Sequence, residues 1–320
     1  MDWSQASAQL EREHAERPVV IPGPQGALFG IFTSPAPNVP PAGKSVILFG
    51  RNRWQRDRMG VDTARLLAQR GFSCLRFDYH GYGESEGPNT VMRTKKPWRD
   101  QAVAVIRFLR ETMGLDRFVV SGFCFDGLTA LSAFQSEWHS IDGLVFIAAP
   151  VLADTLQPIQ FRYVGRARNF SEKIQVFLKL PVAQKLRIVE QTMRRCSERT
   201  SAVVRPALLA IAKGEEELRL SPAFRKSFAA LARSRARALF LYGIDDNEYR
   251  EFQVAERTLF AKLDSETCAR LEIEIWPGQL HVPQATGVQR QILTRTVNWI
   301  ETLHPSYEFL SSQRLSASNL

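Results

Sequence analysis

The residue of the chain that most suggests chemistry is Cys124, which follows a run of strand-forming residues and precedes a run of helical pattern. Glycines flank the nucleophile at such a strand-to-helix turn, because the two backbones pass closely there. Gly122 takes the first flanking place, whereas Asp126 fills the second and the glycine moves on to Gly127. We interpret Cys124 as a nucleophile, and the alternative is a small buried hydrophobic thiol. Asp126 would narrow the turn or place a carboxylate beside the site.

A thiol nucleophile needs a base, and the base needs a group that orients it. Asp245 and Asp246 directly follow one predicted strand, and His281 follows the last predicted strand. Ligands bind at the carboxyl ends of the strands in open α/β sheets, so these side chains can reach one cleft with Cys124. His80 lies in a glycine-rich loop ahead of the cysteine and fits the role of base less well.

The elements that must position these residues alternate along the chain between apolar, strand-like runs and segments of helical periodicity. This alternation predicts a mostly parallel central sheet with helices on both faces. The expected strands are residues 18–21, 27–33, 45–49, 72–77, 117–121, 141–148, 238–242 and 271–276. The expected helices are residues 57–70, 98–113, 127–136, 249–263 and 288–303.

One long segment, residues 152–235, interrupts this alternation with helical patterns and no clear strand. It holds 17 Lys and Arg against 7 Asp and Glu, a net charge of +10, while the whole chain has a net charge of +9. We expect an all-helical basic cap over the carboxyl ends of the strands. Its charge suits an acidic carrier protein or an anionic substrate, although a solvated helical face would look the same. No nucleic-acid-binding motif accompanies the charge, so we expect no nucleic-acid partner.

The predicted division of the chain is an α/β core in residues 1–151 and 236–304, the cap in 152–235, and a flexible tail in 305–320. The four cysteines are widely spaced without a Cys-x-x-Cys pair, which predicts no zinc site and no disulfide framework. We also expect no cofactor. The first 18 residues lack the pattern of a secretory signal, and no apolar run reaches membrane-spanning length. We therefore expect a cytoplasmic protein without a membrane span.

The chain resembles the α/β-hydrolase superfamily over most of its length. The resemblance lies in the order of nucleophile, acid and histidine and in an Asp-x-x-Gly-x-Gly-x-Ser string at residues 78–85, which is a structural loop in that family. It implies an α/β-hydrolase fold with an inserted cap. The family acid commonly stands three residues after a glycine, which favours Asp246, three residues after Gly243, over its neighbour. The implied catalytic triad is Cys124, His281 and Asp246.

The same resemblance locates an oxyanion hole. Phe49-Gly50 corresponds to the family's His-Gly turn, and the backbone N–H after that turn is one donor. The implied donors are the N–H groups of Arg51 and of Phe125, the residue after the nucleophile. The elbow around Cys124 looks like that of dienelactone hydrolases, which use a Cys-His-Asp triad. Residues 49–87 are more similar to serine-aminopeptidase-type hydrolases, among them the cysteine-containing hydrolases associated with exosortase systems.

Together these features predict a hydrolase that cleaves an ester or thioester through an acyl-cysteine intermediate. The expected substrate is a small-molecule or carrier-bound acyl compound. One alternative is an acyltransferase with a carrier- or CoA-bound donor, because an acyl thioester can still acylate an alcohol or an amine. The cysteine-triad polyhydroxyalkanoate synthases of the same superfamily illustrate this. Another alternative is a non-catalytic binding protein on a decayed hydrolase fold, to which the unusual Asp126 and Phe49 point.

Overall fold

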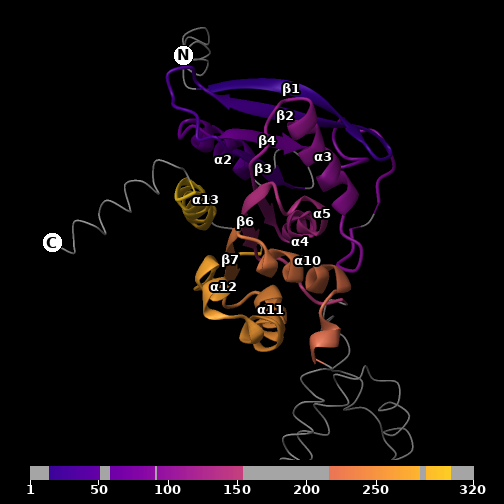
Figure 1. Cartoon of the computed structure of the whole chain (residues 1–320), viewed down its shortest axis with the longest axis vertical. Helices are drawn as coiled ribbons and strands as arrows, with labels where there is room; N and C mark the ends of the chain where they lie inside the picture. The colour runs from indigo at the N-terminus through magenta and orange to yellow at the C-terminus, as the bar shows by residue number, and fades with distance from the viewer. Residues whose placement is uncertain (1–13, 51–57, 91, 154–215, 282–285, 304–320) are drawn as a thin grey trace, which may run out of the picture.

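The structure is a computed structural model that describes residues 14–50, 58–90, 92–153, 216–281 and 286–303. Its centre is one eight-stranded sheet of order β1-β2-β4-β3-β5-β6-β7-β8 (Figure 1). The strands are β1 His14–Gly23, β2 Gly26–Pro35, β3 Ser45–Phe49, β4 Ser73–Phe77, β5 Phe118–Phe123, β6 Ile141–Ile147, β7 Arg237–Gly243 and β8 Leu271–Trp276. β3 to β8 are parallel, whereas β2 is antiparallel to both β1 and β4.

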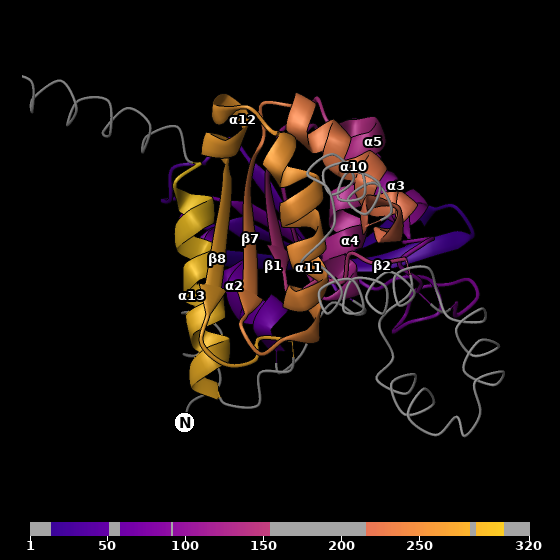
Figure 2. The ribbon, with the colours of Figure 1, turned by 90° about the horizontal axis from the view of Figure 1, so that it is seen from below.

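Helices cover both faces of this sheet, as Figure 2 shows. On one face α2 (Met59–Ala68) and α13 (Thr286–Glu301) pack against the apolar side chains of the strands. The elements of the other face are α3 Arg99–Glu111, α4 Phe125–Ser132, α5 Phe134–Glu137, α10 Pro222–Arg233 and α11 Asn247–Thr258. The short helices η3 (Phe260–Lys262) and α12 (Ser265–Arg270) lead into β8. β3 is buried at every residue, as a central strand covered on both faces should be.

An aromatic cluster fixes α11 on β7. Phe252 of α11 stacks on Tyr242 and Phe240 of β7, with ring centroids 4.5 and 5.5 Å apart. Phe260 completes the cluster at 5.3 Å from both Phe240 and Phe252. Phe252, Tyr242 and Phe240 are fully buried, and each such side chain contributes roughly 1.5–3 kcal/mol of hydrophobic stabilisation. The first turn of α11 is therefore held in a defined place relative to the end of β7.

The mostly parallel sheet with helices on both faces confirms the predicted architecture, with three local differences. The two hairpin strands are longer than predicted: the β1–β2 ladder runs from the pair His14–Pro35 to the pair Gly23–Gly26. The predicted helix 249–263 ends at Thr258 and continues as η3 after Leu259. Ala133 also separates α4 from α5 within the predicted helix 127–136.

Most of the predicted cap, residues 154–215, lies outside the described residues, as does the predicted tail 305–320. The end of the cap segment is described, and it contains α10. Phe224, Phe228 and Leu231 of α10 are buried in the same apolar cluster as α4 and α5. α10 therefore packs as part of the helical layer of the core. The division of the chain into core and cap stays a prediction. In the part of the chain that the structure describes, no helix combines the length and apolarity that crossing a bilayer requires.

Candidate active site

Cys124 occupies a strained turn between β5 and α4. Its φ of 57° and ψ of −133° lie in a region that residues with a side chain rarely adopt. Two main-chain hydrogen bonds hold the turn: the Cys124 N–H donates to the Ile147 carbonyl at 2.8 Å, and the Gly127 N–H donates to the Cys124 carbonyl at 3.0 Å. Backbone strain of this kind persists only where the surroundings impose it, and it is common at active sites. The thiol is thus presented at the carboxyl end of a central strand.

The two glycines of the elbow are required by close backbone approach. A Cβ on Gly122 would lie 2.4 Å from the carbonyl of Asp126, and a Cβ on Gly127 would lie 2.9 Å from the Cβ of Ala149. Gly127, the displaced glycine, therefore lets α4 pack on the loop after β6. Asp126 itself lies in the first turn of α4. Burial and, second, the Asp126 charge raise the pKa of Tyr79 well above its usual value, so this carboxylate lies near the Tyr79 phenol.

The structure brings His281 to the thiol. The Nε2 atom of His281 lies 3.6 Å from the Cys124 sulfur, a hydrogen-bonding distance for sulfur. The other ring nitrogen, Nδ1, lies 2.8 Å from Oε1 of Glu248, in the first turn of α11. His281 and Glu248 are both largely shielded, with side chains 23% and 17% exposed. The Cys124 sulfur, the His281 imidazole and the Glu248 carboxylate thus form a line of three groups. The sequence analysis did not predict Glu248.

Asp246, the acid expected from the sequence, makes different contacts. Its side chain is 2% exposed and accepts hydrogen bonds from main-chain N–H groups of Gly243 at 2.8 Å, Leu280 at 3.1 Å and His281 at 2.9 Å. The carboxylate beside the imidazole ring is that of Glu248 instead. The reason is reach: Asp246 has a short side chain turned into the loop junction, whereas the longer Glu248 extends from the helix. Asp245 is exposed.

The electrostatics of the site favour a charged imidazole. The contact with the Cys124 sulfur and, second, the contact with Glu248 raise the pKa of His281 from 6.5 to about 10, although burial opposes the rise. The raised pKa keeps the proton on the imidazole ring at neutral pH, next to the Cys124 sulfur. Strongly shifted histidines of this kind concentrate at functional sites.

Comparison with known proteins shows the family. The model of the alpha/beta hydrolase fold family matches residues 50–263, which is more than half of the chain. The chain belongs to the alpha/beta hydrolase family. No curated protein sequence matches it.

Solved structures of low sequence identity share this hydrolase fold. One is the esterase Pf2001 of Pyrococcus furiosus, with a TM-score of 0.53, 15% identity and 93% of each chain covered. Another is the proline iminopeptidase of Mycobacterium smegmatis, with a TM-score of 0.52, 14% identity, and 91% of this chain and 99% of that chain covered. A third, an alpha-beta serine hydrolase homologue of Coxiella burnetii, has a TM-score of 0.51 and 13% identity, with 88% and 96% covered. At these identities the likeness shows the α/β-hydrolase fold alone.

Of the two expected oxyanion-hole donors, the structure describes Phe125 and does not describe Arg51. Phe125 is the first residue of α4, and the first N–H groups of a helix have no partner within the helix. Its N–H is therefore of the right kind to receive a developing negative charge. Arg51 lies outside the described residues. The assignment of both N–H groups as oxyanion donors stays a prediction.

Two other candidate residues belong to the scaffold of the hydrolase fold. His80 is 2% exposed, and its Nδ1 lies 2.8 Å from the Glu86 carbonyl. Its Nε2 accepts a 3.3 Å hydrogen bond from the Gln25 N–H. His80 therefore joins the glycine-rich loop to the turn of the β1–β2 hairpin. Asp78 is fully buried at the start of the same loop. Among the described residues, no group of three or more His, Cys, Asp or Glu side chains is arranged to hold a metal ion.

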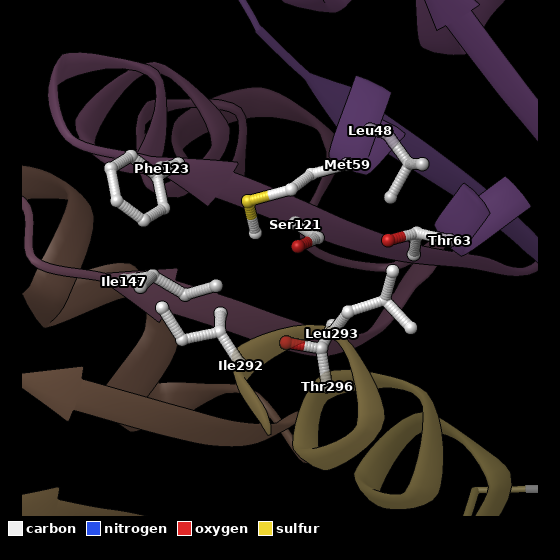
Figure 3. Close-up of a pocket in the computed structure, with 9 residues that line it drawn as sticks. All are labelled: Leu48, Met59, Thr63, Ser121, Phe123, Ile147, Ile292, Leu293 and Thr296. Carbon is white, nitrogen blue, oxygen red and sulfur yellow. The ribbon is translucent and has the colours of Figure 1, made fainter. Parts of the chain in front are cut away.

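A small cavity lies near the elbow, between the sheet and the helices α2 and α13 (Figure 3). Its volume is about 20 Å³, which is room for roughly one water molecule. The hydroxyls of Thr63, Ser121 and Thr296 line it together with the apolar side chains of Leu48, Met59, Phe123, Ile147, Ile292 and Leu293. Cys124 and His281 do not line this cavity. It is too small to hold an acyl chain, so the substrate must approach the thiol from elsewhere.

Proposed function

We propose that this α/β-hydrolase cleaves an ester or thioester through an acyl-cysteine intermediate, with Cys124 as nucleophile, His281 as acid and base, and Glu248 as the charge partner of His281. The observation that carries this proposal is the 3.6 Å contact of the Cys124 sulfur with His281 at a strained elbow. The fold is compatible with the activity, since the esterase Pf2001 of Pyrococcus furiosus shares it. Glu248 replaces Asp246 in this role because it is the carboxylate 2.8 Å from Nδ1.

The first half of the reaction is acylation. The Cys124 thiolate attacks the carbonyl carbon of the substrate, a C–S bond forms, and the carbonyl oxygen becomes an oxyanion. Backbone N–H groups of Phe125 and Arg51 would stabilise that oxyanion, each by about 3 kcal/mol. The intermediate then expels the alkoxide or thiolate leaving group, which takes the proton from Nε2 of His281. The products of this half are the free alcohol or thiol and acyl-Cys124.

The second half is deacylation. Neutral His281 accepts a proton from water while the water oxygen attacks the acyl carbon, and a second oxyanion forms. Its collapse breaks the C–S bond, releases the carboxylic acid and restores the Cys124 thiolate beside protonated His281. In both halves, Glu248 stabilises the positive charge of His281 while the ring is protonated. An alcohol or amine in place of water would make the same site an acyltransferase.

The test is intact-protein mass spectrometry after brief mixing with p-nitrophenyl acetate or an acetyl thioester. We expect a transient gain of one acetyl group in the wild-type protein and none in Cys124→Ala. His281→Ala should acylate at least about a hundredfold more slowly, because general acid–base catalysis typically contributes 10²–10⁴-fold. Decay of the adduct in water, with and without an added alcohol or amine, separates hydrolysis from transfer. A wild-type protein that takes no acyl group from either donor, while iodoacetamide alkylates Cys124 no faster than exposed Cys268, would favour a binding protein instead.

A further inference from the structure

Two carboxylates, Asp246 and Glu248, approach the histidine of the site from different sides. Glu248 contacts the ring at Nδ1, 2.8 Å away. Asp246 contacts the main chain: Oδ1 accepts from the His281 N–H at 2.9 Å, and Oδ2 accepts from the Gly243 N–H at 2.8 Å. The Leu280 N–H lies 3.1 Å from both oxygens. Asp246 therefore links the loop after β7 to two consecutive N–H groups of the loop after β8.

The hydrogen bonds from Asp246 to the main chain restrict the position of the His281 imidazole ring. The N–H groups of Leu280 and His281 fix the main chain just before the His281 Cα, and hence the direction in which its side chain leaves the backbone. Two further hydrogen bonds join the same loops, from Ile244 N–H to Trp276 O at 2.8 Å and from Asp245 N–H to Gly278 O at 3.1 Å. Only the Asp246 carboxylate, among these contacts, reaches His281 itself.

The crowding around Asp246 shows that the junction is closely packed. A Cβ on Gly243 would lie 2.4 Å from the Gly278 carbonyl and 2.9 Å from Oδ2 of Asp246. A carboxylate buried to this degree is costly unless it is fully hydrogen-bonded, and three main-chain donors meet that need. An asparagine of the same size has one acceptor oxygen and one N–H₂ donor. It could not accept hydrogen bonds from all three main-chain N–H groups.

We propose that Asp246 is a positioning residue that fixes the main chain of His281, while Glu248 is, among the described carboxylates, the one that contacts the imidazole ring and stabilises its charge. This inference rests on the proposed function, because it divides the role of the triad acid between two residues. Fixing the main chain places Nε2 against the Cys124 sulfur before any substrate binds. Positional errors of about 1 Å at such a contact can cost a hundredfold in rate.

The test compares Asp246→Asn with Glu248→Gln, and Asp245→Asn is the matched control. The side chain of Asp245 is exposed, so its variant makes the same chemical change in solvent and leaves the main-chain bond from the Asp245 N–H to the Gly278 carbonyl in place. The Asn amide group at 246 would point an N–H₂ donor at one of the three main-chain donors, whichever way it is turned. We expect amide hydrogen exchange at Leu280 and His281 to rise by about tenfold or more in Asp246→Asn. The same exchange should stay at the wild-type rate in Glu248→Gln and Asp245→Asn.

Two further measurements distinguish the positioning role of Asp246 from the electrostatic role of Glu248. Acylation by Asp246→Asn should fall by about a hundredfold at every pH, whereas Glu248→Gln should lower the pH at which acylation is lost. In the wild-type protein, the Leu280 and His281 amides should exchange at least about a hundredfold more slowly than that of exposed Gln279. This wild-type comparison needs no variant to fold. The proposal is overturned if those two amides exchange as fast as Gln279, or if Asp246→Asn keeps them protected and shifts the pH limit as Glu248→Gln does.

Failure of this inference can be told apart from failure of the proposed function. Amide exchange is measured without substrate, and so is the titration of His281 by NMR. If Cys124 never takes an acyl group, the proposed hydrolase activity fails while the exchange data still decide the role of Asp246. If the acyl adduct forms but the exchange pattern is unchanged in Asp246→Asn, the activity stands and the positioning role is wrong.

Discussion

Replacing Glu248 with Gln keeps the size of the side chain and removes its charge, so it isolates what the carboxylate does to His281. The pKa of His281 is raised from 6.5 to about 10, and 10 − 6.5 is a rise of about 3.5 units, or ~5 kcal/mol at 1.36 kcal/mol per unit. The Cys124 sulfur is the larger cause and Glu248 the second. An opposite charge in contact with a titratable group shifts its pKa by about 1–3 units. Because Glu248 is the second cause, we expect about one to two units from it, or ~1.4–2.7 kcal/mol. The pKa of His281 in Glu248→Gln should fall to roughly 8–9.

The sign of the effect follows from which form of the ring is needed. Acylation uses the protonated imidazole to supply the leaving group with a proton, so the rate should fall as pH rises through the pKa of His281. That fall is expected near pH 10 in the wild-type protein and about one to two units lower in the variant. The raised pKa also stabilises the fold: this contribution is complete below pH 6.5 and is lost as pH rises towards 10.

The assay is NMR of the protein labelled in its histidine rings, titrated from about pH 6 to pH 11. The chain has five histidines, and the His281→Ala spectrum identifies the signal that belongs to the site. A Cys124→Ser variant serves as the control, since removing the thiolate should lower the pKa of His281 more than Glu248→Gln does. Our reasoning is refuted if wild-type His281 titrates near its usual 6.5, or if Glu248→Gln leaves its titration unchanged.

Four further results are expected from the elbow and its surroundings, all measured by chemical denaturation. Cys124→Gly should be more stable than Cys124→Ala by about 1–2 kcal/mol, because glycine relieves the strain at φ 57°; a more stable Ala variant would contradict the strain. Gly122→Ala should cost at least about 2 kcal/mol, since its Cβ would lie 2.4 Å from the Asp126 carbonyl. Gly287→Ala is the matched control: its Cβ would meet no described atom within 4 Å at the start of α13, so stability should change by no more than about 0.5 kcal/mol. Thr296→Val should raise stability by up to about 1 kcal/mol, because the buried Thr296 hydroxyl has no hydrogen-bond partner among the described residues; a loss would indicate a bound water.

The elbow around Cys124 and the succession of strands and helices along the chain could be predicted because both are local patterns of the sequence. The strand, the two glycines and the helix around Cys124 are consecutive in the sequence, and the close approaches at Gly122 and Gly127 explain why both glycines stand there. The alternation of strands and helices likewise fixes the parallel sheet. His281 was predictable because it lies in the loop after β8, the last strand.

The carboxylate of the site could not be chosen from spacing alone. Asp246 and Glu248 both follow β7 within a few residues, and which one reaches the ring depends on the side-chain direction at the start of α11. One signal was available: a glutamate in the first turn of a helix that begins at the carboxyl end of a strand points towards the shared edge. The position of α10 was also readable, since Phe224, Phe228 and Leu231 recur at helical spacing, as in a helix that packs on a core.

The distance along the chain between the thiol and its base has a consequence for the synthesis of the protein. Cys124 and His281 are 157 residues apart, and ribosomes add roughly 5–20 residues per second. The thiol therefore exists for roughly 8–30 s before its proposed base has been made. His281 also depends on β8, which needs β7 as its neighbour in the sheet. If the proposed mechanism holds, a nascent or truncated chain carries Cys124 without its base, and the two side chains meet only when the last strand has joined the sheet.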